Sequence, residues 1–173
     1  MSWTRAVIVG GIGAVALLAS VALPASAAPS GTTTTTFTLS SGTIDIAVAS
    51  SASLPGGNSG TTSVSGQIGS VTVTDSRGNL VGWTASAAST AFTGDSGTIS
   101  TAVSYSSGAV SKTGTVTVVG SGTVALTTVP APVVAGTSVV GNNTATWNPT
   151  LTVTLPQNSL AGIYTGTVTT SVA

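Results

Sequence analysis

Beyond residue 27 the chain alternates branched apolar residues with threonine and serine, a period of two that suits an extended strand. No window in this part repeats apolar residues at the three-to-four spacing of a helix. Glycine, asparagine, serine and proline, which favour turns, separate the alternating runs. The sequence therefore predicts an all-β protein, an antiparallel β-sandwich of the Greek-key kind found in Ig-like and jelly-roll-like folds.

The strands themselves can be placed from the alternating apolar positions. A segment with Pro130 and Pro132 predicts a crossing connection or a sheet edge, because proline cannot donate a ladder hydrogen bond. Gly141-Asn142-Asn143 predicts a turn. We expect strands over 44–48, 71–74, 81–85, 99–105, 116–118, 124–126, 144–147, 151–155 and 164–172.

The first 27 residues have the organisation of a secretory signal peptide. Arg5 supplies a positive charge, an apolar stretch follows from Ala6 to Leu23, and Ala25-Ser26-Ala27 fits a cleavage site. A membrane anchor is the alternative, since this apolar stretch is almost long enough to span a bilayer, but glycines interrupt it. The sequence predicts a helical signal peptide over 1–27, and hence a secreted protein.

Two further segments follow the signal peptide. Residues 28–36 predict a threonine-rich linker that leads into the first strand, or alternatively a site for O-linked sugars. Residues 37–173 predict one domain, which is long enough to bury about two-thirds of its unfolded surface. The chain has no cysteine, so this domain must be stable without disulfides.

Charged side chains are scarce beyond residue 27 and do not suit catalysis or nucleic-acid binding. Two scattered cations cannot replace the counterions of a nucleic acid. Histidine, cysteine and glutamate are absent, so a serine or cysteine hydrolase lacks its base. A glycan hydrolase would need two of the three aspartates to converge, and two of these lie in predicted turns. We expect no catalytic residue, no metal and no cofactor; the charged residues are Asp45, Asp75, Asp95, Arg77 and Lys112.

Three aromatic residues stand out as candidates for either the core or a binding surface. Trp83, Trp147 and Tyr164 fall on the apolar faces of predicted strands. Burial in the core is the favoured interpretation, because large aromatic side chains contribute strongly to packing. The alternative is an exposed platform that stacks on a glycan, which would require these rings to share an outer face.

Two segments resemble the motifs of the WxL domain, a surface domain of Gram-positive bacteria. Residues 71–78, followed by Gly82-Trp83-Thr84-Ala85, are similar to its proximal motif. Residues 161–170, which begin Ala-Gly-Ile-Tyr-Thr-Gly, are similar to its distal motif. Ala85 stands where the family has leucine, and Thr170 stands where the family has a second tryptophan. The alanine-rich composition suits an actinobacterial branch of the family.

The resemblance implies a non-catalytic cell-surface protein that associates noncovalently with the cell wall. Its partner would be peptidoglycan or another wall glycan, sometimes with other surface proteins, and Trp83, Trp147 and Tyr164 would be its binding residues. The alternative function is a self-assembling structural or adhesion subunit, which uncharged, threonine-rich strands with little edge protection favour. Neither function involves nucleic acid, or a membrane after signal cleavage.

Overall fold

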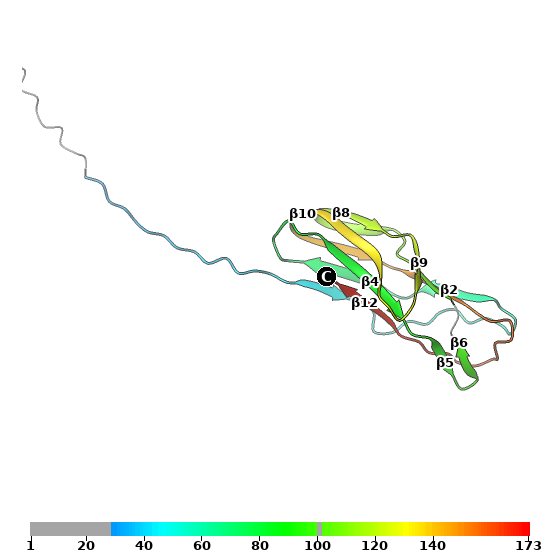
Figure 1. Cartoon of the computed structure of the whole chain (residues 1–173). Helices are drawn as coiled ribbons and strands as arrows, with labels where there is room; N and C mark the ends of the chain where they lie inside the picture. Colours follow the sequence, from blue (N-terminus) through cyan, green and yellow to red (C-terminus); the bar gives the residue numbers. More distant parts are fainter. Residues whose placement is uncertain (1–28, 100–101) are drawn as a thin grey trace, which may run out of the picture. The chain divides into compact units, whose positions relative to one another are not determined.

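The computed structural model describes residues 29–99 and 102–173, and these residues form an all-β structure (Figure 1). Residues 29–38 are exposed and contain no strand, whereas Leu39–Ala173 form a compact unit. The expected antiparallel β-sandwich is confirmed, and the predicted signal peptide over 1–27 lies outside the described residues. No helix among the described residues is long and apolar enough to cross a membrane.

Two antiparallel sheets and a small hairpin contain all the strands of the described part. The larger sheet has the order β1-β3-β10-β4-β12, with β8 also paired to β10, and its outer strands β1 and β12 contact each other. The smaller sheet has the order β2-β11-β7-β9, and β5 pairs with β6. The strands are β1 Ile44–Ala47, β2 Ser63–Gln67, β3 Val71–Asp75, β4 Trp83–Ser89, β5 Phe92–Gly94, β6 Gly97–Ile99, β7 Val103–Ser106, β8 Val110–Gly120, β9 Thr123–Leu126, β10 Ala131–Trp147, β11 Thr150–Thr154 and β12 Val168–Val172.

Strand β10 is the longest element and organises the larger sheet. Its first part pairs with β4, its last part pairs with β3, and β8 runs beside both parts. Register shifts interrupt the pairing with β8 between Thr137 and Asn143, where Ser138 and Gly141 have positive φ angles of 51° and 69°. The predicted turn at 141–143 is therefore wrong: these turn-forming residues make bulges inside one continuous strand.

Pro132 lies near the start of β10, where β10 has a paired strand on one side only, so of the two predicted alternatives the sheet edge is confirmed. It pairs with Ser86 of β4 at a register shift, and β8 joins β10 only from Val134 onwards. Proline is tolerated at such a bulge because the ladder is already interrupted there and no N–H donor is missed.

Smaller differences concern strand limits. The predicted strand over 99–105 is two strands, β6 and β7, on either side of residues 100–101. Strand β2 was not predicted, because Val64 is its only large apolar residue. The last strand begins at Val168, so Tyr164 precedes it rather than lying within it.

The core lies between the facing sheets and is made of alternating side chains from both. Val73 and Ala145 of the larger sheet and Leu151 of the smaller sheet are almost completely buried. The Nε1 atom of Trp147 in β10 donates a 2.8 Å hydrogen bond to the Tyr105 hydroxyl in β7, which joins the two sheets. Both rings are buried, and burial raises the pKa of Tyr105, although the bond from Trp147 acts in the opposite direction.

Candidate binding cleft and polar network

An ion pair between a buried carboxylate and a partly exposed arginine lies in the turn between β3 and β4. The Asp75 carboxylate is almost completely buried, and its two oxygens accept bonds of 2.9 and 3.0 Å from Nε and Nη2 of Arg77. Its Oδ1 also accepts a bond from the Arg77 backbone amide, and Arg77 Nη2 donates to the carbonyls of Val81 and Gly82. Arg77 therefore joins the start of this turn to its end.

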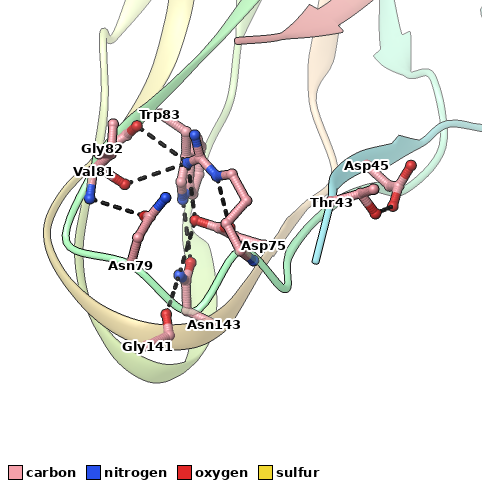
Figure 2. A network of polar contacts seen from close by, with 10 residues as sticks. Thr43, Asp45, Asp75, Asn79, Val81, Gly82, Trp83, Gly141 and Asn143 are labelled. Atoms are coloured by element: carbon pink, nitrogen blue, oxygen red, sulfur yellow. Dashed lines mark hydrogen bonds and ion pairs between the residues drawn. The ribbon is translucent and has the colours of Figure 1, made fainter. Parts of the chain in front are cut away.

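Asn143, from a distant part of the chain, and Trp83, at the start of β4, complete this network (Figure 2). Asn143 of β10 is buried; its Nδ2 donates to Asp75 at 3.4 Å and to the Gly141 carbonyl at 3.3 Å. Its Oδ1 accepts a 3.2 Å bond from Nε1 of Trp83. We refer to Asp75, Arg77, Trp83 and Asn143 as the polar network, which ties the bulged part of β10 to the start of β4.

The buried charged and polar side-chain atoms of this network are all paired. Hydrogen bonds from Arg77 hold the pKa of the Asp75 carboxyl below its usual value, against the opposite effect of burial. Every buried side-chain nitrogen and oxygen of the described residues has a partner. The Asp-x-Arg-Gly turn and the following tryptophan therefore have a structural role here, as parts of one hydrogen-bonded unit.

The two tryptophans proposed as binding residues are both core residues. The exposed fractions of Trp83 and Trp147 are 3% and 2%, and each indole N–H bonds to another buried side chain. The favoured interpretation of these two rings as core residues is confirmed. Neither presents a free face on which a glycan could stack.

An open cleft lies beyond the other end of β4 and is lined in part by the β5–β6 hairpin. Figure 1 shows the position of this hairpin. Its volume is about 530 Å³, and its two walls are the loop 52–61 and the segment 159–166. Its floor is apolar and comes from the smaller sheet, the residue that follows β11, and the hairpin, through Val64, Val153, Leu155, Phe92 and Ile99. Among the residues that the structure describes, no acidic or basic side chain lines it.

The segment 159–166 is held by backbone contacts with the hairpin rather than by a sheet. Thr93 and Thr165 exchange both backbone hydrogen bonds, at 2.8 and 2.9 Å, and the Ser96 hydroxyl donates to the Ala161 carbonyl. Glycines permit this approach, because a methyl group at Gly94 would overlap the Ile163 carbonyl and one at Gly166 would make an unusually close contact with the Phe92 ring. This explains why the predicted strand is displaced towards the C-terminus.

Tyr164 is the one predicted site residue that borders an open space. It lines the cleft, it is partly buried, and its hydroxyl donates a 2.9 Å bond to the Leu160 carbonyl. Beside it, Leu160 and Ile163 are 65% and 88% exposed. The structure therefore separates the predicted residues: Tyr164 belongs to the cleft, whereas the tryptophans belong to the core.

Sequence reasoning missed the cleft because its walls come from segments about a hundred residues apart. The glycines at 56, 57 and 60 are typical of a loop, and the structure has a loop over 52–61. Nothing in either segment alone shows that they face each other; only the pairing of β2 with β11 brings them together.

The remaining charged residues do not form a second site. The Asp45 carboxylate accepts a 2.8 Å bond from the Thr43 hydroxyl, and Lys112 donates to the Val116 carbonyl. Within 29–99 and 102–173, no three acidic, histidine or cysteine side chains gather as metal ligands would.

Comparison with known proteins identifies no relative of this chain: no family model, curated protein or solved structure matches it.

Proposed function

We propose that this chain is a secreted, non-catalytic cell-envelope protein that associates noncovalently with the cell wall through a WxL-like domain. Its partner is peptidoglycan or another wall glycan. The observation that supports this proposal is the position of residues 161–166, which resemble the distal motif of that family and form one wall of the neutral cleft. In this proposal, Tyr164 is the motif residue placed to contact the ligand.

The chemistry of the cleft suits a neutral, partly apolar ligand. Pyranose rings present C–H faces that pack on apolar and aromatic side chains, and hydroxyls that bond to backbone groups. Leu160, Ile163 and Tyr164 supply the first kind of surface, and the glycine-rich loop 52–61 exposes backbone groups of the second kind. A glycosidase would place two carboxylates about the scissile bond, and the lining has none.

Sedimentation with purified cell walls tests this proposal. We expect the protein to pellet with the walls and to be released by a chaotrope. Leu160→Ser should weaken binding roughly fivefold to tenfold, the loss expected when one leucine side chain no longer contributes to the interface. Leu80→Ser is the matched control, because Leu80 is 75% exposed and lies outside the cleft.

Two results would overturn the proposal. One is a protein that stays in the supernatant at every wall concentration. The other is equal weakening by both leucine substitutions, which would show that binding does not use the cleft.

A further inference from the structure

Strand β8 has the longest unpaired edge among the described strands. Its 11 residues, Val110–Gly120, pair with β10 on one side, and no strand of the described part pairs with the other. An edge of this kind presents backbone N–H and C=O groups that can pair with a strand from another chain.

Only the first half of this edge is protected. Lys112 pairs in register with Ala145, which is fully buried, so its side chain leaves the strand on the core side of the sheet. Its ammonium group donates to the Val116 carbonyl, and Gly114 beside it has a positive φ of 75°. A charged lysine on an edge strand and a bulge both disfavour strand addition, whereas residues 115–120 carry no charge.

The two faces of β8 differ in chemistry. Thr113, Thr115 and Thr117 are exposed on the outer face, whereas Val116 is buried and Val118 is half-buried on the inner face. Threonine hydroxyls already pair across this sheet: Thr113 bonds to Thr144, and Thr72 bonds to Thr146 at 3.1 Å. A further strand with threonines outside and large apolar residues inside would match both faces.

Residues 32–39, which we call the N-terminal segment, have this composition. They read Thr-Thr-Thr-Thr-Thr-Phe-Thr-Leu, so every second position from Thr32 to Thr38 is threonine, and Phe37 and Leu39 share the opposite face. Phe37 is 87% exposed and Leu39 is 89% exposed. No strand is formed by this segment, although its residues favour strands.

We propose that the N-terminal segment of one copy pairs with the free edge of β8 in a second copy. Its threonines extend the outer rows of hydroxyls, while Phe37 and Leu39 cover the inner face beside Val116 and Val118. The driving force is the burial of two highly exposed apolar side chains together with new backbone hydrogen bonds.

The sheet order favours a second copy over the same chain as the acceptor. Asp45 of β1, Thr74, Thr144 and Thr113 of β8 lie in one row across four strands. The N-terminal segment leads into β1, which is therefore about 14 Å, or three strand spacings, from β8. Because donor and acceptor are different segments of the chain, the contact is heterologous, and repeated from copy to copy it builds linear chains or closed rings. This inference does not depend on wall binding.

Cysteine cross-linking tests the pairing directly, because the chain has no cysteine of its own. A Thr38→Cys variant is mixed with Thr113→Cys, Thr115→Cys or Thr117→Cys and oxidised. We expect mixed dimers with at least one β8 variant. Dimers formed chiefly by the β8 variants alone would overturn the proposal, since they would show a symmetric β8–β8 contact.

Sedimentation velocity supplies the second measurement. We expect the sedimenting mass to rise with protein concentration. Association should weaken at least tenfold in Thr35→Pro and should persist in Thr35→Val. Lys112→Thr should strengthen association, because it removes the protection of the edge. Residue 35 lies outside the compact unit, so the circular dichroism of Thr35→Pro should be unchanged. A concentration-independent monomer, or association that Thr35→Pro leaves intact, would overturn the proposal.

Discussion

The two ends of the Leu39–Ala173 unit are built with different chemistry. At the start of β4, the polar network joins a turn to β10 through an ion pair and buried side-chain hydrogen bonds. Beyond the end of β4, the cleft walls are held by backbone bonds and by glycines, and the lining carries no charge. The difference indicates that one end is a fixed part of the scaffold, whereas the other leaves apolar side chains open to a ligand.

The cost of burying charge explains why the network has so many partners. An unpaired carboxylate inside a protein is unfavourable by several kcal/mol, and only multiple well-directed hydrogen bonds compensate for it. Asp75 accepts four such bonds, three from Arg77 and one from Asn143. Removing one partner of Asp75 should therefore lower the free energy of unfolding much more than replacing an exposed residue of the cleft.

The largest effect is expected for Arg77→Ala. This change leaves the buried Asp75 carboxylate without its cation, and should lower the free energy of unfolding by about 3 kcal/mol, as measured by urea denaturation. Asp95→Ala is the control, since Asp95 is exposed and has no ion-pair partner among the described residues. A loss below about 1 kcal/mol in Arg77→Ala would contradict the assigned role of the network.

Two glycine substitutions compare the packing of the two ends. A methyl group at Gly136 of β10 would overlap the buried Trp83 ring, so Gly136→Ala should destabilise by about 1–3 kcal/mol. Gly56→Ala in the cleft loop meets no atom within 4 Å and should change stability little, or raise it by a few tenths of a kcal/mol. Thermal denaturation of both variants would measure the contrast, and equal effects would refute it.

The pH dependence of stability should also arise from the network. Because the folded pKa of Asp75 is below its unfolded value of about 3.9, its contribution is complete above that value. It is lost as the pH falls through the folded pKa, at no more than about 1.4 kcal/mol per pH unit. Urea denaturation between pH 2 and pH 6 should show this slope. Asp75→Asn should reduce it, and an unchanged slope would assign the effect to another group.

The smallest effect on stability is expected at the cleft. Ile163→Ser and Val129→Ser both replace exposed residues, so each should change the free energy of unfolding by less than about 0.5 kcal/mol. Only Ile163 lines the cleft, and only its substitution should reduce sedimentation with cell walls. Destabilisation by Ile163→Ser alone would show that the residue belongs to the scaffold.

The sequence predicted the sandwich because alternation directly reports which face of a strand is buried, as in Val71 and Val73 of β3. It failed in β10, where Gly141 and the asparagines form bulges, because turn and bulge use the same residues and differ only in what pairs beside them. The ion pair spans two residues, but its contact with Asn143 spans 68. The sequence predicted one residue of the cleft, Tyr164. The opposite wall, the loop 52–61, could not be predicted because its position depends on how the strands pair.

Mapping the contact surface by NMR tests the central claim, that ligands meet the neutral end while the polar network serves the fold. The labelled protein would be titrated with soluble peptidoglycan fragments and its amide shifts followed. The account predicts saturable shifts in residues 52–61 and 159–166, with residues 75–83 unchanged. Shifts centred on 75–83, or none at saturating fragment, would contradict it.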